Sequence, residues 1–272
     1  MAPFKLMGVI NVTPDSFSDG GAFMEPESAV MHGKRLVNEG ADILDIGGES
    51  TRPGAGPVSE DEELWRVMPV LEGLAQSGAQ LSIDTMKPGV ARHAIEVGAT
   101  IVNDVTAFRF APEMAQLVAE SGAITCLMHM LGEPRTMQLN PTYDDVVSDV
   151  KSFLEERLAF ATGEGVPEEK IWLDPGIGFG KNIDHNLELL RRLDELAAIG
   201  RPLVIGTSRK SFLGKLTGRD VAERLAGTIA TNVLALERGA TIFRVHDVAE
   251  VGDALKVAAA TVGSPTWTTP ST

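Results

Sequence analysis

The chain has 272 residues and a formal net charge of −14, because 38 acidic residues outnumber 24 lysines and arginines. An acidic surface repels a polyphosphate backbone, so the composition argues against nucleic acid as a partner. No apolar run is long enough to span a bilayer and no signal segment opens the chain, which predicts a cytoplasmic protein without a membrane partner.

Apolar runs rich in Val and Ile alternate with amphipathic segments that end at glycine, the pattern of successive strand and helix units. The predicted strands are residues 5–12, 41–47, 80–85, 100–105, 123–129, 171–175, 202–207 and 240–246. The clearest predicted helices are residues 60–75, 90–97, 111–120 and 187–199. Eight units without a long polar linker predict an α/β fold, a single-domain (β/α)8 TIM barrel over residues 1–263, with an open doubly wound sheet as the alternative. The segment 264–272 is rich in Pro, Thr and Ser and is predicted to be a disordered tail.

Three further features are weak signals for other kinds of site: a dinucleotide-binding loop, a reactive cysteine and a metal-binding histidine. The glycine-rich segment 176–180 lacks the GxGxxG spacing of dinucleotide-binding folds and follows the sixth strand, not the first. Cys126 is the only cysteine and lies in an apolar run, which predicts a buried, inert thiol. His129 ends the fifth strand, but no two histidines have metal-ligand spacing, so a zinc hydrolase barrel is not favoured.

Polar side chains occupy the predicted C-terminal ends of the strands, the edge of a barrel where active sites form. Alternation along the eighth strand places Arg244 and His246 on one face, so both are predicted to point into the barrel mouth. Buried charges are costly when unpaired, so such a cluster implies a ligand or mutual pairing, although any single member could be a strand-end cap. The polar loops 13–21 and 49–54 are typical of active-site lids. The strand-end residues are Asn11, Asp45, Asp84, Asn103, Asp104, His129, Asp174, Lys210, Arg244 and His246.

Six segments together resemble the dihydropteroate synthase family of pterin-binding barrels. They are MGVINVTPDSFSDGG (7–21), DIGGESTRPG (45–54), SIDT (82–85), DPGIGFGK (174–181), TSRKSFLG (207–214) and RVHD (244–247). They occur in family order and at barrel spacing over nearly the whole chain. One departure is the sequence Thr106-Ala107-Phe108 after the fourth strand, where the family commonly has small residues, and it leaves the shape of that loop open.

The resemblance implies a transferase of folate biosynthesis and a target of sulfonamides. Its substrates would be (7,8-dihydropterin-6-yl)methyl diphosphate and 4-aminobenzoate, its products 7,8-dihydropteroate and diphosphate, and its expected assembly a homodimer. The implied pterin-binding residues are Asp84, Asn103, Met128, Asp174, Phe179 and Lys210. The implied diphosphate-binding residues are Asn11, Arg244 and His246, with the cofactor Mg²⁺ held at Asn11. The implied 4-aminobenzoate-binding residues are Phe17, Thr51, Arg52, Pro53 and Ser211, and the implied catalytic residues are Asp19, Lys210 and Arg244.

The chemistry of this reaction fits the residue types. A carboxylate such as Asp174 can accept two parallel hydrogen bonds from the amino group and ring N–H of a pterin. An electron-rich dihydropterin stabilises a cation at its exocyclic carbon, so a dissociative displacement needs positioning and electrostatics more than a nucleophile and base. Two alternatives stay open: a methyltetrahydrofolate–corrinoid methyltransferase, which shares the barrel but needs no diphosphate site, and a pterin-binding paralogue without catalysis.

Overall fold

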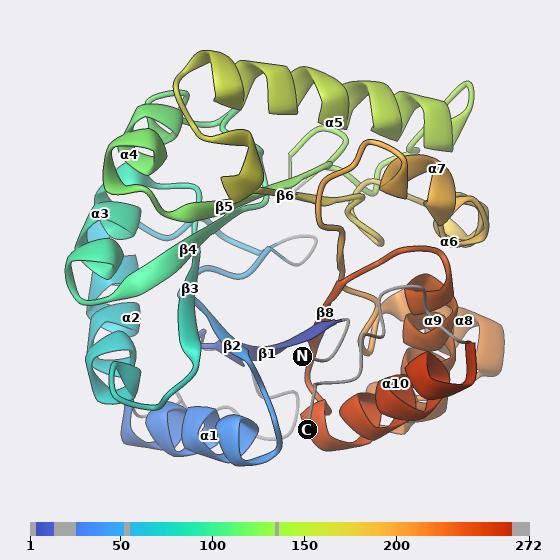
Figure 1. The fold of residues 1–272 in the computed structure, drawn as a ribbon, viewed down its shortest axis with the longest axis horizontal. Coiled ribbons are helices and arrows are strands. Elements are labelled where there is room, and N and C mark those ends of the chain that lie inside the picture. The colour runs from blue at the N-terminus through green and yellow to red at the C-terminus, as the bar shows by residue number, and fades with distance from the viewer. Residues whose placement is uncertain (1–3, 14–25, 52–54, 134–135, 263–272) are drawn as a thin grey trace, which may run out of the picture.

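The structure is a computed structural model that describes residues 4–13, 26–51, 55–133 and 136–262. Within these residues, eight parallel strands form one sheet that curves into a barrel (Figure 1). Their order is β6-β5-β4-β3-β2-β1-β8-β7, and a parallel bridge between Leu173 and Leu203 connects the two ends of the sheet. The predicted (β/α)8 barrel is therefore confirmed, and the open doubly wound sheet is wrong. The strands are β1 (Lys5–Asn11), β2 (Ile43–Gly47), β3 (Gln80–Asp84), β4 (Ala99–Asp104), β5 (Ile124–Met128), β6 (Ile171–Asp174), β7 (Val204–Ile205) and β8 (Ile242–Val245).

Helices lie around the outside of the barrel and cover its outer face (Figure 1). Their ends follow local rules: the Ser59 hydroxyl caps α2 by accepting a 3.2 Å hydrogen bond from the Glu62 amide, and α4 stops at Gly122, whose φ of 68° favours glycine. In the described segments, no helix is both long and apolar enough to cross a membrane. The helices are α1 (Pro26–Asn38), α2 (Glu60–Leu74), α3 (Pro88–Glu96), α4 (Met114–Ser121), α5 (Val146–Gly163), α6 (Ile183–Arg191), α7 (Leu193–Ala197), α8 (Ser211–Thr217), α9 (Leu225–Glu237) and α10 (Val248–Val262), with short 3₁₀ turns η1 (Glu168–Lys170) and η2 (Val221–Glu223).

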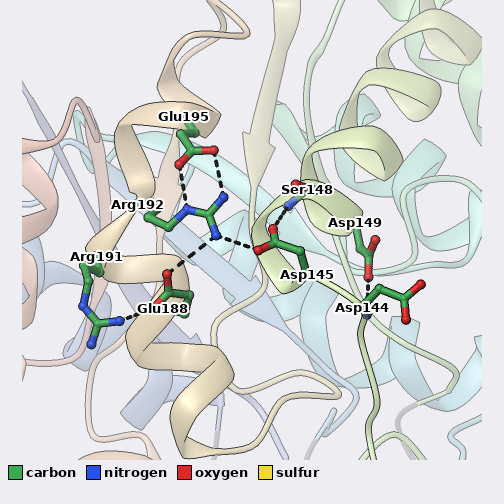
Figure 2. A network of polar contacts seen from close by, with 8 residues as sticks. All are labelled: Asp144, Asp145, Ser148, Asp149, Glu188, Arg191, Arg192 and Glu195. Carbon is green, nitrogen blue, oxygen red and sulfur yellow. Dashed lines mark hydrogen bonds and ion pairs between the residues drawn. The ribbon is translucent and has the colours of Figure 1, made fainter.

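The single helix predicted over residues 187–199 is wrong, because the chain breaks into α6 and α7 at Arg192. This residue has φ −110° and ψ 30°, which interrupts the helix. Its guanidinium donates to Glu195 at 2.6 Å and to Asp145, the N-cap residue of α5, at 2.7 Å, and it also pairs with Glu188 (Figure 2). The break therefore places one cation where three helix ends meet, an arrangement that helical periodicity alone does not reveal.

The interior of the barrel begins with an apolar layer made of one inward-facing residue from each of seven strands. Cys126 belongs to this layer, is 1% exposed, and has a thiol whose pKa is raised by burial, so the predicted buried cysteine is confirmed. A larger apolar cluster fills the space between the strands and the surrounding helices. The layer closes the barrel below its mouth. Its members are Met7, Ile43, Ile101, Cys126, Trp172, Val204 and Ile242.

Candidate active site

The polar residues of the mouth follow the apolar layer by two positions along the same strands, so they share its inward orientation. This register confirms the alternation argument for Arg244. The strand β1 lies between β8 and β2, and the Arg244 side chain extends past it to the carboxylates of Asp45 in β2 and Asp84 in β3. The residues that follow the layer in this way are Asp45, Asn103, Asp174 and Arg244.

Asp45 lies at the centre of a buried hydrogen-bond network. Its Oδ2 accepts from Arg244 Nε at 2.7 Å and from Asn103 Nδ2 at 3.2 Å, and its Oδ1 accepts from the Ser82 hydroxyl at 2.6 Å. Arg244 Nη2 also donates to Asp84 Oδ2 at 2.8 Å. Sequence reasoning placed Asp45 at a strand end but gave it no role, because its partners come from three other strands.

Burial sets the ionisation of this network. It raises the pKa of Asp84 to about 7, and the nearby Asp45 carboxylate adds to the rise while Arg244 opposes it. Burial acts to lower the pKa of Arg244, but Asp45 and Asp84 outweigh it, so that pKa is raised above its ordinary value. The guanidinium therefore stays charged, whereas Asp84 can exchange a proton near neutral pH.

A second group lies on the side of β6 and β7. The Asp174 carboxylate accepts a 2.6 Å hydrogen bond from the Gly176 amide, and burial raises its pKa. Lys210, the residue that precedes α8, donates from Nζ to the Ile177 carbonyl and lies 4.6 Å from the centre of the Phe179 ring. Burial lowers the pKa of Lys210 to about 8, although Asp174 opposes this. A carboxylate, an ammonium group and an aromatic ring thus meet here.

Gly206 keeps the space between the two cations open. It follows β7 at the inward-facing position, two residues after Val204. A Cβ atom at this glycine would lie 3.9 Å from Arg244 Cβ and 3.9 Å from Lys210 Nζ. Any larger side chain would enter the space between these groups.

The other predicted pterin and diphosphate residues also lie at strand ends. Asn11 is the last residue of β1 and is partly buried. Met128 is the last residue of β5, is buried, and belongs to an apolar cluster against which Phe179 packs. His246 follows β8, and its Nδ1 lies 2.9 Å from the Ser208 hydroxyl.

The predicted 4-aminobenzoate residues are described only in part. Thr51 is partly buried in the loop after β2, and Ser211, the first residue of α8, is exposed. A cavity of about 210 Å³ lies between the end of β1 and the start of α2, lined among others by Ser50 and Arg66, but not by Thr51 or Ser211. The predicted residues Phe17, Asp19, Arg52 and Pro53 lie outside the described residues, as does the tail 264–272.

Two strand-end residues that the sequence grouped with the mouth, Asp104 and His129, face outward instead, because each follows an inward-facing residue by one position. The Asp104 carboxylate accepts from the Thr106 amide and hydroxyl, both at 2.7 Å, and from the Phe108 amide at 3.0 Å. This fixes the fourth loop in a turn with left-handed Ala107 (φ 51°) and Phe108 (φ 64°), and the Phe108 ring is buried.

His129 packs behind the mouth, not in it. Its Nδ1 lies 2.9 Å from the buried Lys181 Nζ, and its ring meets the Phe153 ring edge-on at 4.8 Å. Burial lowers the pKa of His129 to about 2, so the imidazole is neutral. Across the described ranges, no group of three or more His, Cys, Asp or Glu side chains is arranged to hold a metal ion.

A buried ionic cluster that sequence reasoning missed supports the base of the loop after β2. Lys87 Nζ forms ion pairs with Glu49 and with the fully buried Glu63. Arg66 donates to the Gly48 carbonyl at 2.7 Å from the neighbouring helix α2. The loop that carries Thr51 is thereby attached to α2 and to the segment after β3.

Comparisons with known proteins match this architecture. The family model described as pterin binding enzyme matches residues 7–246, from β1 to the residue after β8. The chain is 48% identical over 260 residues to the dihydropteroate synthase of Escherichia coli (strain K12), covering 95% of this chain and 92% of that protein. Its fold matches Yersinia pestis dihydropteroate synthase with a sulfonamide drug complex at a TM-score of 0.91 and 44% identity, covering 96% and 94% of the two chains. It matches the Xanthomonas albilineans dihydropteroate synthase in complex with 7,8-dihydropteroate at a TM-score of 0.86 and 46% identity, with the same coverage of 96% and 94%.

Proposed function

Because the chain belongs to the family of pterin-binding enzymes, as a dihydropteroate synthase, we propose that its barrel mouth binds a dihydropterin diphosphate beside 4-aminobenzoate. The reaction transfers the pterinylmethyl group to the aromatic amine, with release of diphosphate and formation of 7,8-dihydropteroate in folate biosynthesis. One observation carries the proposal: the Asp84, Asn103, Asp174 and Lys210 group and the Arg244 guanidinium converge on one strand-end surface.

The pterin would lie on the β3, β4 and β6 side of the mouth. Asp174 would accept from the pterin amino group and ring N–H, and Asp84 would accept as a second carboxylate. Asn103 can donate and accept at once, which suits a heterocycle with mixed edges, and Lys210 can donate to a ring oxygen or nitrogen. Met128 and Phe179 would supply the apolar walls, in keeping with their shared cluster.

The diphosphate would lie between β1 and β8, against Asn11, Arg244 and His246. Arg244 has five N–H donors, and the Asp45 and Asp84 contacts engage Nε and Nη2, which leaves Nη1 protons to meet phosphate oxygens. Asn11 offers an amide oxygen at the same edge. Since Mg²⁺ prefers oxygen ligands and usually keeps water and substrate phosphates in its shell, Asn11 together with the diphosphate fits this ion. The bound ion would neutralise part of the diphosphate charge.

The mechanism that these residues support is a dissociative displacement. The bond between the exocyclic carbon and the diphosphate oxygen breaks, its electron pair leaves with diphosphate, and Arg244 stabilises the negative charge that develops there. The amine of 4-aminobenzoate then forms the new bond to that carbon and releases a proton to solvent. Lys210 and Asp174 hold the pterin in place during both steps, so positioning supplies much of the rate. Asp19, in the loop 13–21, is proposed to act on the same step.

The 4-aminobenzoate would lie on the β2 and α8 side, near Thr51 and Ser211, with Phe17, Arg52 and Pro53 completing its site. Ser50, the residue before Thr51, lines the cavity between β1 and α2, which supports a ligand site on the β2 side of the mouth. Sulfonamide analogues of 4-aminobenzoate are expected to compete for the same place. We further propose a cytoplasmic homodimer, for which the exposed Leu216 of α8 and Leu234 of α9 offer apolar contact surface. Sedimentation velocity tests the dimer.

The direct test supplies the purified chain with the pterin diphosphate, 4-aminobenzoate and Mg²⁺. Equal amounts of dihydropteroate and diphosphate are expected, with turnover lost on chelation by EDTA and regained with Mg²⁺. Pterin binding without turnover would indicate a paralogue that lacks catalysis. Failure to release diphosphate, combined with methyl transfer from methyltetrahydrofolate to a corrinoid, would indicate the methyltransferase instead.

A further inference from the structure

The Asp45 carboxylate joins the two halves of the proposed site, although it was assigned to neither. It is 0% exposed and lies within β2, with β1 on one side and β3 on the other. Its Oδ2 accepts hydrogen bonds from Asn103 Nδ2 of β4 at 3.2 Å and from Arg244 Nε of β8 at 2.7 Å. One oxygen atom therefore contacts a residue proposed for the pterin and a residue proposed for the diphosphate.

The contact determines how Asn103 presents its amide. An ionised carboxylate accepts hydrogen bonds and cannot donate, so the NH₂ group of Asn103 must face Asp45 and the carbonyl oxygen must face away. Without this acceptor, the amide could rotate by half a turn and exchange its donor for its acceptor. The edge of Asn103 that a pterin meets is thus selected by Asp45.

The same contact determines the plane of Arg244. Its Nε donates to Asp45 and its Nη2 to Asp84, so two carboxylates from neighbouring strands hold one edge of the guanidinium. A planar group held at two points on one edge keeps a defined orientation of the opposite edge. That opposite edge includes the Nη1 donors proposed to meet the diphosphate.

We propose that Asp45 is a positioning residue that orients the Asn103 amide and the Arg244 guanidinium through a single buried carboxylate, and so aligns the pterin with its leaving group. This inference rests on the proposed function, because it uses the roles given there to Asn103 and Arg244. The Ser82 hydroxyl, which donates to Oδ1 at 2.6 Å, holds the carboxylate itself in place. A fixed network of this kind lets both parts of one substrate bind in register with the bond to be broken.

The test uses Asp45→Asn in the full chain. The amide oxygen can replace Oδ2 and the amide nitrogen can donate to Ser82, so the shape of the side chain is kept while its charge is lost. The new amide and the Asn103 amide can then both turn over, which gives their hydrogen bond a second arrangement. We expect the dissociation constants of the diphosphate-free pterin and of inorganic diphosphate with Mg²⁺ both to rise about tenfold or more, as for loss of a supporting partner. The KM for 4-aminobenzoate should stay within about twofold, since the site proposed for it, at Thr51 and Ser211, does not include Asp45.

The diphosphate measurement distinguishes positioning from simple charge. Removing a negative charge beside Arg244 should by itself attract diphosphate more strongly, whereas loss of orientation weakens its binding. Tighter binding of inorganic diphosphate in Asp45→Asn would therefore overturn the proposal, and so would unchanged affinity for both ligands. The matched control is Asp104→Asn, another fully buried carboxylate with three hydrogen bonds, which should lower Tm and leave both affinities unchanged.

A measurement on the unchanged protein covers the case in which Asp45→Asn does not fold. The Nε–H of Arg244 should give a slowly exchanging NMR signal that remains slow when the pterin and diphosphate bind together. Fast exchange in that complex would mean that Asp45 releases the guanidinium, and would overturn the proposal. If the unchanged protein neither binds the pterin nor releases diphosphate, the proposed function itself fails, an outcome distinct from a normal enzyme that is insensitive to Asp45.

Discussion

At the scale of single residues, the mouth contains two carboxyl groups whose ionised form is opposed by burial. Burial, and after it the neighbouring Asp45 carboxylate, raises the pKa of Asp84 to about 7, while Arg244 favours its charged form. Asp174 has a raised pKa as well, although Lys210 opposes the effect of burial. Carboxyl groups with shifted pKa values in a cleft are typical of functional sites, because a ligand with suitable donors can restore the charge.

The pKa of Asp84 predicts a pH dependence of pterin binding. Pterin donors require the ionised carboxylate, so affinity should rise as pH increases through about 7, the pKa of Asp84. It should fall again as pH increases through about 8, where Lys210 loses its proton and a donor. Calorimetry across this range should give a bell-shaped profile, and Asp84→Asn should change its acid limb to the part that Asp174, whose pKa burial also raises, contributes. A flat profile for the unchanged protein would contradict both assignments.

The same shift has a consequence for stability. The folded pKa of about 7 lies above the ordinary value of 3.8, so the folded state binds this proton more tightly between the two values. The contribution of Asp84 to the free energy of unfolding therefore decreases as pH rises from 3.8 to about 7. Urea unfolding of Asp84→Asn should show a smaller decrease over that interval, and an unchanged slope would argue against the shift.

Asp174→Asn should weaken pterin binding while the loop after β6 is kept. The amide oxygen can still accept from the Gly176 amide, but the NH₂ group then faces the pterin donors. The loss should be about 1.5–3 kcal/mol, the value of a hydrogen bond to a charged group. Calorimetry with the diphosphate-free pterin measures it, and Asp145→Asn, in the outer network of Figure 2, serves as a control without effect on affinity. An unaffected pterin affinity would remove Asp174 from the site.

At the scale of elements, β7 contributes space where the other strands contribute side chains. It spans only Val204–Ile205, and the inward position that follows is Gly206. This glycine is absent from the described residues with positive φ, so its backbone accepts other residues without strain. The reason for glycine here is therefore the space between Arg244 and Lys210.

Gly206→Val should block the pterin and spare the fold. A branched side chain would enter the space between Arg244 and Lys210, with a penalty on pterin binding of about 1–3 kcal/mol, the usual cost of overpacking. Gly206→Ala adds one methyl group at ordinary contact distance and should have a smaller effect. Tm should change little in both variants. Normal pterin affinity in Gly206→Val would place the ligand elsewhere.

The helix break at Arg192 is expected to matter for stability alone. Arg192→Ala removes the contacts with Asp145, Glu188 and Glu195 shown in Figure 2, and should lower Tm slightly with kcat and KM unchanged. Because the pairs are partly exposed, added salt should reduce the Tm difference between variant and parent. A difference that persists in high salt would point to packing of the arginine stem instead.

At the scale of the whole molecule, the barrel separates stability from chemistry in two layers. The apolar layer closes the interior, and the polar residues two positions later form the mouth. A substitution in the lower layer should therefore change the free energy of unfolding without changing the ligand geometry.

Ile101→Ala tests this separation. Ile101 is fully buried in the apolar layer, and its truncation should cost about 2–5 kcal/mol in urea unfolding, whereas Ile101→Val should cost about 0.5–1.5 kcal/mol. The dissociation constant of the pterin, measured well below Tm, should be unaffected in both. A large loss of affinity would show that the layers are coupled, since Asn103 lies two residues further along β4.

The amino-acid sequence by itself determined the alternation of strands and helices, the barrel, and the inward direction of Arg244. These depend on local backbone geometry, in which side chains alternate along a strand and amphipathic helices repeat every few residues. The motifs from 7–21 to 244–247 also carried the family, and with it the activity. Loop contacts and helix breaks, such as the break at Arg192, were not predicted from the sequence.

Only the tertiary structure decided which polar groups meet. Arg244 and Asp45 are separated by 199 residues along the chain, and barrel closure alone brings them to 2.7 Å. The strand register likewise turns Asp104 and His129 away from the mouth, although both stand at strand ends. Lys87 joins Glu49 to Glu63 for the same reason. Such pairings depend on the relative placement of distant elements, which no local pattern specifies, and they set the charge and orientation of the groups that perform the chemistry.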